Sequence, residues 1–360
     1  MSDLNLLHVF TDMGIGGTER VMYQISDFML DEKGVTVTVA STDGPMEKKF
    51  LERGIKNFRV RNFKKKHKIF SNIKDLSGII KKTNPNVIHT HSLYSLVLIF
   101  FISKYLNKKK FKIVHTGHGG PKKNYDRIAR KLVWMTDRYI AISEYSYSNL
   151  IERSKSSKVK LIRNGVDLPS QDEKSLGDVT EKPLKISFIG RLTKQKGLIY
   201  LLEAVKEIVS INKKKVHLKI VGDGDLKNEL EEYVKIHNLE TYITFLGYQE
   251  KPWQMVADSQ VIVMPSIWEN GGLVAMEAIV RDYTVVASKI QGLKDTISDC
   301  YNGYYITPSD SSSIVRVITD IYEGKKELIQ LSTKEKSKYV FNESTGPKLK
   351  KLYLELTKEG

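Results

Sequence analysis

The chain has 360 residues, 41% of them hydrophobic, which is enough for one large core or two medium ones. Its one cysteine, Cys300, excludes a disulfide framework and fits a reducing compartment. The longest apolar run, Leu96–Ile102, is far shorter than the roughly 20 residues of a spanning helix. The first residues, MSDLNLLHVF, carry an acid and lead directly into a strand pattern, so we expect no secretory signal. We therefore expect a cytoplasmic protein that is soluble or peripheral on a membrane.

The net charge of +16 is unevenly distributed along the chain. Residues 1–166 hold 31 Lys and Arg against 14 Asp and Glu, a net of +17, whereas residues 167–360 hold 27 against 28, a net of −1. This asymmetry predicts an acidic partner for the first half: a membrane surface, a polyanion or nucleic acid. The candidate contact residues come from its lysine runs: Lys64, Lys65, Lys66, Lys122 and Lys123.

Strand-like apolar runs alternate with helical patterns through the first half. In residues 18–30, for example, Val21, Met22, Ile25 and Met29 share one helical face. The expected strands are 6–10, 35–40, 87–91, 112–116, 139–142 and 160–162.

The second half follows the same plan. Its expected strands are 184–189, 216–221, 243–246, 261–264 and 284–287, alternating with helices near 197–209, 225–237 and 273–280. This order predicts α/β architecture: two doubly wound, Rossmann-like domains that face each other across a cleft. We expect them at 1–166 and 184–344, with a polar linker at 167–183 and a C-terminal helix within 345–360 joined to the first.

Ligands of doubly wound sheets bind at the carboxyl ends of the strands, so the turns there are the candidate sites. The first is a glycine turn with Gly14, Gly16 and Gly17, where a phosphate or sugar could approach bare backbone and a helix N-terminus. It lacks the Gly-Lys-Ser/Thr of a P-loop and the spacing of a dinucleotide fingerprint. A merely tight turn is the alternative.

Cations and glycines follow two strands of the second half. Arg191 and Lys196 stand directly after a strand, where a diphosphate could bind them, although solvated loop cations are the alternative. The next turn holds Gly222, Asp223 and Asp225. No histidine or third carboxylate completes a metal site there, so we interpret Asp225 as a helix cap and expect no metal.

The segment IWENGGLVAMEA (267–278) holds two glutamates around bare backbone. Asn270, Gly271 and Gly272 precede a helix whose first N–H groups are free to bind an anion. Glu269 lies in the loop and Glu277 lies two turns into the helix, so only packing could bring both to one ligand. Carboxylates accept hydrogen bonds from paired hydroxyls of a sugar or ribose. A surface role for both is the alternative, but it leaves the glycines unexplained.

Four histidines lie at two strand ends of the first half. His89, His91, His115 and His118 could suggest zinc, but no cysteine or carboxylate accompanies them at ligand spacing. His89 and His91 share a strand face, and we assign structural roles to them and to His115. His118 lies in the glycine-flanked turn TGHGGP, where folding does not require an imidazole. It is the functional candidate.

Taken in order, these motifs resemble the retaining nucleotide-sugar glycosyltransferases of family 4 (glycosyl transferases group 1), which have the GT-B fold. Almost the whole chain is covered: the first glycine loop, His118, IAIS (140–143), LIRNGVD (161–167), FIGRLTKQKG (188–197), KIVGDGDLK (219–227), and the two glutamates with seven residues between them. In one departure, Asn270-Gly271-Gly272 stands where the family commonly has glycine, an aromatic residue and glycine. The missing aromatic leaves the donor sugar open.

The resemblance implies roles for these residues. Glu269 would contact the donor sugar, Glu277 the ribose diol, and Arg191 with Lys196 the departing diphosphate. Asn270, Gly271, Gly272 and Leu273 would present backbone N–H groups, Gly16, Gly17 and Gly222 would line the donor site, and His118 would act at the reacting centre. No metal or other cofactor would then be needed. The donor, a UDP-sugar by preference, would react with a lipid-linked or polyanionic envelope glycan at the inner face of the cell membrane.

Three other functions remain open at this stage. A glycoside hydrolase also uses two carboxylates, but it does not need the diphosphate cations. A nucleotide-sugar epimerase shares the architecture, and would consume donor without an acceptor. The charge also allows a nucleic-acid binder, but no recognition helix, zinc pair or aromatic–basic strand pattern is present, and we expect no nucleic acid as a partner.

Overall fold

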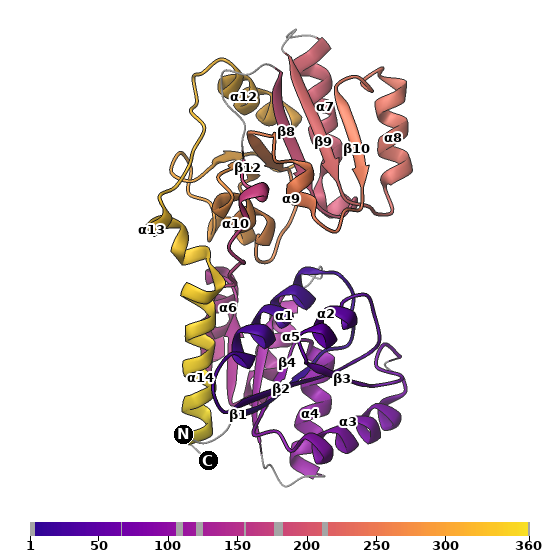
Figure 1. Ribbon diagram of the computed structural model, residues 1–360, viewed down its shortest axis with the longest axis vertical. Coiled ribbons are helices and arrows are strands. Elements are labelled where there is room, and N and C mark those ends of the chain that lie inside the picture. Colours follow the sequence, from indigo (N-terminus) through magenta and orange to yellow (C-terminus); the bar gives the residue numbers. More distant parts are fainter. Residues whose placement is uncertain are drawn as a thin grey trace. The chain divides into compact units, whose positions relative to one another are not determined.

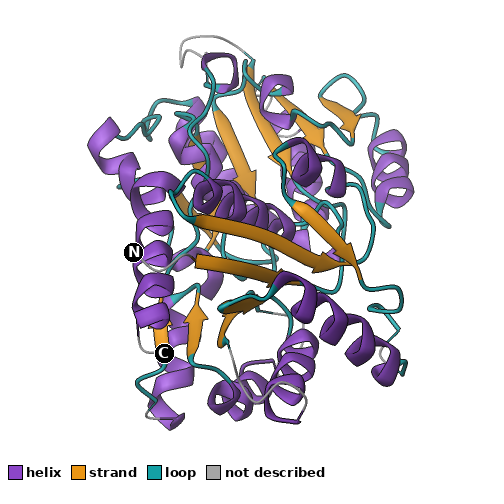
Figure 2. Cartoon of the chain, turned by 60° about the horizontal axis from the view of Figure 1, so that its bottom comes forward, coloured by secondary structure: helices purple, strands orange, loops and turns teal. Residues whose placement is uncertain are grey.

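The computed structural model describes residues 4–65, 67–105, 111–119, 125–154, 156–175, 183–210 and 215–358. The chain divides into two compact units (Figure 1): Met1–Gly165 with Phe341–Gly360, and Val166–Val340. Each is built on a parallel sheet with helices on both of its faces (Figure 2). The predicted α/β class with two doubly wound sheets is confirmed.

The first unit contains a 7-stranded sheet in the order β3-β2-β1-β4-β5-β6-β7. The direction of winding therefore reverses between β1 and β4. Its elements are β1 (Leu4–Val9), α1 (Gly17–Leu30), β2 (Val35–Ser41), α2 (Glu47–Glu52), β3 (Lys56–Arg59), α3 (Ile69–Thr83), β4 (Val87–Thr90), α4 (Leu93–Tyr105), β5 (Lys112–Gly117), α5 (Tyr125–Leu132), η1 (Val133–Met135), β6 (Arg138–Ala141), α6 (Glu144–Ser154), β7 (Val159–Leu161), the π-helical turn η5 (Phe341–Thr345) and α14 (Gly346–Lys358).

The second unit contains a 6-stranded sheet in the order β10-β9-β8-β11-β12-β13, so its winding reverses between β8 and β11. Its elements are η2 (Gln171–Glu173), β8 (Leu184–Ile189), η3 (Lys194–Lys196), α7 (Leu198–Ser210), β9 (Val216–Val221), α8 (Lys227–Ile236), β10 (Ile243–Gly247), α9 (Pro252–Met255), β11 (Val261–Met264), α10 (Leu273–Val280), β12 (Thr284–Ser288), α11 (Gln291–Lys294), β13 (Tyr304–Ile306), α12 (Ser311–Tyr322), α13 (Thr333–Lys336) and η4 (Ser337–Tyr339).

Alternation along β1 and β4 gives the two faces of the first sheet different chemistry. Leu7 and Ile88 belong to an apolar core that they share with residues of α3 and α4. His8 and His89, which are register partners, lie on the opposite face. There α14 packs on both strands, and its Tyr353 is hydrogen-bonded to His89.

The C-terminal segment belongs to the first unit, which resumes at Phe341 rather than at residue 345. Helix α14 contacts α1, β1 and β4. At its start, a Cβ on Gly346 would lie 2.9 Å from ring atoms of Phe28, so a larger residue there would push the helix from α1.

Part of the segment expected as a linker, 167–183, contacts the second unit. The Glu173 carboxylate accepts a hydrogen bond from Arg281 Nη2 at 2.8 Å, and the Ser175 backbone N–H donates to the Arg281 carbonyl at 2.9 Å. Arg281 is only 7% exposed, and a buried guanidinium needs a counter-charge, which Glu173 supplies. Residues 176–182 lie outside the described part of the chain.

Candidate active site

Two loops meet where the winding of the second sheet reverses. The loop after β8 and the loop after β11 are joined by backbone and side-chain contacts: Ile267 N–H donates to the Gln195 carbonyl at 2.8 Å, and Gln195 Nε2 to the Trp268 carbonyl at 3.1 Å. Gly197, at φ +63°, permits the approach, because a Cβ there would lie 2.2 Å from the Pro265 carbonyl oxygen. This is the position at which doubly wound sheets bind ligands.

An ion pair between Lys196 and Glu269 lies at this meeting point. The Lys196 ammonium donates to Oε1 of Glu269, and Ser266 Oγ donates to the same oxygen at 3.1 Å. The Lys196 and Glu269 side chains are only 15% and 11% exposed. Each charge therefore has a partner where burial would otherwise make it costly. The resemblance implied separate ligand contacts for Lys196 and Glu269, and in the structure the two side chains also contact each other directly.

The bare backbone at 270–272 leads into α10. Gly272 is the N-cap of the helix at φ +57°, a left-handed conformation that favours glycine, and no side chain caps the helix. The loop packs against the start of α11, where a Cβ on Gly292 would lie 1.9 Å from the Glu269 carbonyl oxygen. Asn270, Gly271 and Leu273 are half-buried at this turn. The first N–H groups of α10 are therefore without a side-chain cap from the described residues.

The turns after β8 and β9 also lie against each other. A Cβ on Gly222, at φ +141°, would lie 1.9 Å from the Gly190 carbonyl oxygen, so only glycine allows this packing. The predicted helix cap is wrong, because the N-cap of α8 is Leu226 and makes no side-chain hydrogen bond. Asp223 Oδ1 instead accepts from the N–H of Gly224 at 2.7 Å, which stabilises the turn itself.

The two remaining donor-site candidates of the second unit are placed but not linked to the ion pair. Arg191 is exposed in the turn after β8. Glu277 is half-buried within α10, and its backbone carbonyl accepts a hydrogen bond from Arg281 Nη1 at 3.2 Å. Their proposed contacts with a nucleotide stay predictions.

A carboxylate of the protein itself lies beside the glycine turn of the first unit, and the sequence did not suggest it. Glu19, in the first turn of α1 and 7% exposed, places its carboxylate beside the glycines. A Cβ on Gly16 would lie 2.7 Å from Glu19 Oε2, and one on Gly14 would lie 3.1 Å from Oε1. The glycines thus make room for a carboxylate of the chain itself. A carboxylate at the N-terminus of α1 suits the helix dipole and disfavours a phosphate in the same place. A donor contact by Gly16 and Gly17 stays a prediction.

Histidines gather at the winding reversal of the first sheet. His8, His89, His91 and His115 are buried, and His118 is half-buried in the turn after β5. His91 is hydrogen-bonded to His8 at 2.8 Å and to His118 at 3.0 Å, from different ring nitrogens. Burial lowers the pKa of His8 and His115 to about 3 and that of His118 to about 4. It also lowers the pKa of His89 and His91. All five imidazoles are therefore neutral near pH 7.

Three of these imidazoles have nitrogens close enough to consider for a metal. Those of His8, His89 and His91 lie within 4.8 Å of one another. Each nitrogen of His89 already has a partner, Tyr353 or Thr116, at 2.7 Å, and both nitrogens of His91 bond to histidines. An ion would have to replace these hydrogen bonds. The geometry therefore favours a hydrogen-bonded cluster.

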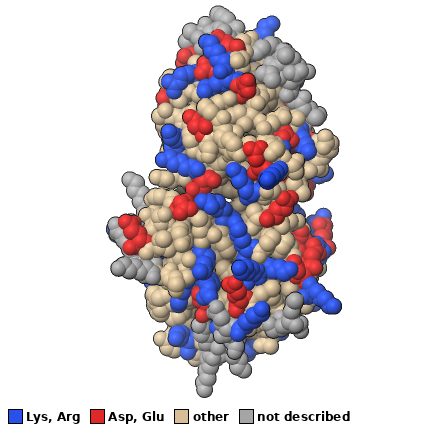
Figure 3. Space-filling view, turned by 90° about the vertical axis from the view of Figure 1, so that its left-hand side faces the viewer, with Lys and Arg blue, Asp and Glu red and all other residues tan. Residues whose placement is uncertain are grey.

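The lysine-rich segment after β3 is partly paired. The Lys64 ammonium lies 2.7 Å from Asp12 Oδ1. Arg59 and Arg61 also face carboxylates, at 3.6–3.8 Å. Lys65 and Lys68 are exposed. Lys66, Lys122 and Lys123 lie outside the described residues. Figure 3 shows Lys and Arg at several places on one face of the first unit, among Asp, Glu and uncharged residues.

The apolar segments near these cations divide into buried and exposed parts. Residues 96–102 belong to α4, a core helix between β4 and β5 that is buried mainly through Leu96, Leu98, Ile99 and Ile102. Phe63, in the lysine-rich segment, is fully buried and so belongs to the core and not to an exposed apolar surface. Phe70, at the start of α3, is 89% exposed. None of the described helices is long and apolar enough to cross a bilayer.

Comparison with known proteins assigns the chain to a family. The family model "Glycosyltransferase Family 4" matches residues 15–169, and "Glycosyl transferases group 1" matches residues 171–338. A Klebsiella pneumoniae relative, an uncharacterized 41.2 kDa protein in the cps region, is 30% identical over 272 residues, which are 69% of this chain and 74% of the relative. The chain belongs to glycosyltransferase family 4. The two matched ranges together include every candidate residue of this glycosyltransferase except Gly14.

Two further comparisons cover nearly its full length. The UDP-Gal:alpha-D-GlcNAc-diphosphoundecaprenol alpha-1,3-galactosyltransferase of Escherichia coli is 26% identical over 90% of this chain and 89% of its own. The crystal structure of Anabaena HepE in complex with UDP and glucose superposes with a TM-score of 0.79 at 19% identity, covering 97% of this chain and 99% of HepE. The predicted GT-B fold is confirmed.

Proposed function

We propose that this glycosyltransferase moves a sugar from a UDP-sugar to a lipid-linked or polyanionic cell-envelope glycan, with retention of the anomeric configuration. The observation that carries the proposal is the ion pair of Lys196 and Glu269 at the reversal of the second sheet. A cation and a carboxylate held in one partly buried place suit a ligand with an anionic part and a hydroxyl-bearing part.

Lys196 and Glu269 would each contact a different part of the donor when it binds. The Lys196 ammonium has three donors and can turn from Glu269 to phosphate oxygens, with Arg191 as a second cation. Glu269 can then accept hydrogen bonds from sugar hydroxyls, while Glu277 holds the ribose diol. The uncapped N–H groups of α10 complete an anion-binding wall.

The transfer balances without another reactant. The bond from the sugar C1 to the diphosphate oxygen breaks as a bond from C1 to the acceptor oxygen forms on the same face. The acceptor hydroxyl proton passes to the departing UDP. Cations beside the diphosphate stabilise its growing charge, which is the task that a metal performs in other transferases. We therefore propose catalysis that is independent of metals.

The acceptor proposal rests on the first unit and on the relatives. Its sequence carries the whole excess of positive charge, and the exposed Lys65, Lys68 and Phe70 lie close together in sequence where α3 begins. Cations beside an exposed aromatic suit an anionic membrane surface. The E. coli relative is named for a diphosphoundecaprenol acceptor, and the Klebsiella relative is encoded in a cps region.

A donor screen tests this function. The full chain is mixed with UDP-, GDP- and ADP-sugars, and binding and slow hydrolysis are measured before a polyprenyl-diphosphate sugar acceptor is added. We expect a UDP-sugar to be consumed rapidly only with acceptor, in EDTA as in buffer, and NMR to show the donor's anomeric configuration in the product. An inverted product, or a complete loss in EDTA that Mn²⁺ restores, contradicts the mechanism. Rapid conversion of the donor to its epimer without acceptor would indicate the epimerase instead.

A further inference from the structure

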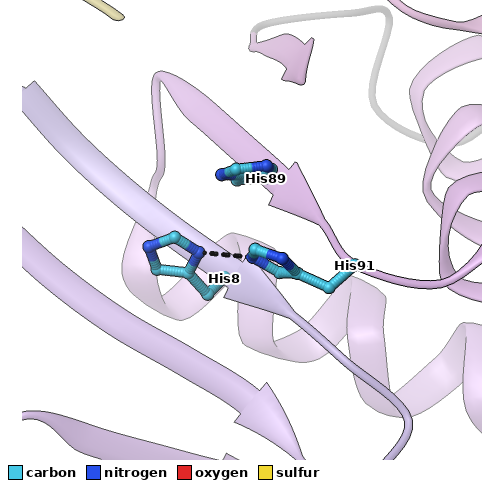
Figure 4. Close-up of side chains that lie close together, drawn as sticks. All are labelled: His8, His89 and His91. Atoms are coloured by element: carbon cyan, nitrogen blue, oxygen red, sulfur yellow. Dashed lines mark hydrogen bonds between the residues drawn. The ribbon is translucent and has the colours of Figure 1, made fainter. Parts of the chain in front are cut away.

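A chain of hydrogen bonds joins three imidazoles of the first unit, from His8 in the buried sheet to His118 in the turn after β5. His8 Nδ1 lies 2.8 Å from His91 Nε2, and His91 Nδ1 lies 3.0 Å from His118 Nε2. Figure 4 shows the inner link, from β1 to the residue that follows β4. The successive ring centroids are 5.1 and 5.3 Å apart. The chain therefore runs from the core out to the turn after β5.

His89 lies beside this chain but does not belong to it. Its ring centroid is 4.2 Å from that of His91, yet its nitrogens bond to Tyr353 and Thr116. His115 is also separate, because its Nδ1 bonds to Thr90 Oγ1 at 2.8 Å. Two buried histidines of the same sheet thus serve as internal comparisons.

The protonation of one ring determines that of the next. A neutral imidazole has one N–H donor and one bare acceptor nitrogen. In a chain of neutral rings, each ring must accept on one side and donate on the other, so only two directions are possible. In one, the last ring presents Nδ1–H to a ligand; in the other, it presents a bare Nδ1.

The inner end of the chain favours the outward direction. Nε2 of His8 is buried and has no hydrogen-bond partner in the structure as described. The inward direction would make it an N–H donor without an acceptor, whereas the outward direction leaves a bare nitrogen. Among backbone groups, buried donors without partners are rarer than acceptors without partners, and we apply the same preference here.

We propose that His8 and His91 are positioning residues, which hold His118 as the tautomer whose Nδ1–H donates a hydrogen bond to the bound sugar or acceptor. Nδ1 is the nitrogen of His118 that has no hydrogen bond to a described residue. In this state His118 is a donor and does not remove a proton. The inference rests on the proposed function, because the sugar or acceptor that His118 would contact is the one proposed there.

Nitrogen NMR of the ¹⁵N-histidine-labelled full chain tests the tautomer without any substrate. We expect His118 near pH 7 to be neutral with its proton on Nδ1. His8→Leu removes the inner donor and should convert part of His118 to the Nε2–H form. His8→Asn keeps an N–H at the place of Nδ1 and should preserve the wild-type spectrum of His118. His115→Leu, which removes a buried imidazole outside the chain, should preserve it too.

Kinetics on the same variants separate positioning from a general loss of stability. We expect His8→Leu to lower kcat on the order of tenfold with little change in donor KM, as loss of an outer partner of a functional histidine does in metal sites. His8→Asn should restore most of kcat, and His115→Leu should keep it even if its Tm falls. At the site itself, His118→Asn, with an amide N–H near the place of Nδ1, should retain more activity than His118→Gln.

Each outcome of these experiments either supports or contradicts the inference. A wild-type His118 that is protonated on Nε2, or an unchanged His118 spectrum and kcat in His8→Leu, overturns the inference. A wild type with no transferase activity on any donor contradicts the proposed function; the spectra would then still show whether His8 fixes the tautomer, and the ligand part of the inference would be wrong.

Discussion

The two units share one architecture but place opposite chemistry at the same point. Where the second sheet reverses its winding, the partly buried side chains are a cation and a carboxylate, Lys196 and Glu269. Where the first sheet reverses, they are neutral imidazoles, His8, His89 and His91. Both groups of side chains lie at or near the carboxyl ends of the strands, where doubly wound sheets bind ligands. The two units therefore differ in the residue types at this point and not in their fold.

Burial explains why each arrangement is stable. A charge that loses water needs a partner, and in the second unit Lys196 and Glu269 provide one for each other. In the first unit burial lowers the pKa of each histidine, so that the cluster carries no charge. The second unit is thus suited to an ionic ligand, and the first to hydrogen bonds with hydroxyl groups.

The largest effect should come from breaking the ion pair. Lys196→Ala removes the cation proposed to meet the departing diphosphate, and we expect kcat/KM to fall at least about 100-fold, as loss of one contact to developing charge does elsewhere. Lys194→Ala, an exposed lysine of the same turn, is the matched control and should stay close to wild type. Steady-state rates with the accepted donor measure both.

A second variant shows whether that loss is only structural. Lys196→Ala leaves Glu269 partly buried without its cation, so its Tm should fall. The double variant Lys196→Met/Glu269→Gln has no charge to bury and should recover stability without recovering activity. Full activity in the double variant would show that the pair serves folding alone.

The neutral cluster predicts a pH dependence of stability in the opposite unit. The pKa of His115 is lowered by burial to about 3, so near pH 5 the unfolded chain binds a proton that the folded chain does not. The stability that His115 contributes is therefore present above pH 6.5 and is lost as the pH falls, by about 2 kcal/mol at pH 5.

A double difference isolates this contribution. The unfolding free energies of wild type and His115→Leu are compared at pH 7.5 and pH 5, where the difference between the two proteins should shift by about 2 kcal/mol in favour of the variant. His67→Gln, at an exposed histidine, is the control and should show little shift. The same shift in both variants would mean that burial is not the cause.

The two glutamates of the second unit should separate binding from turnover. Glu277→Ala removes the proposed partner of the ribose diol, and we expect the Kd of free UDP to rise about tenfold, or about 1.4 kcal/mol. Glu269→Ala should change that Kd less and lower kcat more, because Glu269 addresses the sugar. Calorimetry with UDP tests this, with Glu232→Ala on the exposed face of α8 as control. The reverse pattern would exchange the two roles.

The sequence predicts the fold well because its strands are buried. The ranges expected for β8, β9 and β11 agree with the structure. β11 is a continuous buried apolar run, and in β8 and β9 a buried apolar residue recurs at every second position between polar turns. The edge strand β3 was not predicted, because its side chains are exposed or half-buried and show no apolar pattern. Local pattern therefore suffices where both faces of a strand are covered.

The site is less predictable because it depends on packing between distant segments. Lys196 and Glu269 are each recognisable from their motifs, but their ion pair joins loops from two strands, and no spacing encodes that contact. The same holds for Glu19, which folds back onto the glycine turn. His8 has one signal that could have found it: in a doubly wound order β1 lies beside β4, which brings it level with His89. Ser266, which binds Glu269, has none.

The smallest effect concerns the surface charge of the two units. Lys65 lies on the first unit, exposed and close in sequence to the 89% exposed Phe70, and we expect it to contact an anionic membrane. Lys65→Gln should then weaken binding to vesicles with anionic lipid by about 1 kcal/mol, roughly fivefold. Neutral vesicles should bind little of either protein, and high salt should release both.

Two control variants locate this effect. Lys64→Gln should weaken binding less than Lys65→Gln, because Asp12, at 2.7 Å, already offsets the Lys64 charge. Lys251→Gln makes the same charge change at an exposed lysine of the second unit and should have no effect if the first unit alone meets the membrane. Co-sedimentation at physiological salt measures all three. Equal losses would show that binding follows net charge and not this surface. Equal binding of the wild type to neutral and anionic vesicles would leave a soluble polyanion as the partner of the basic unit.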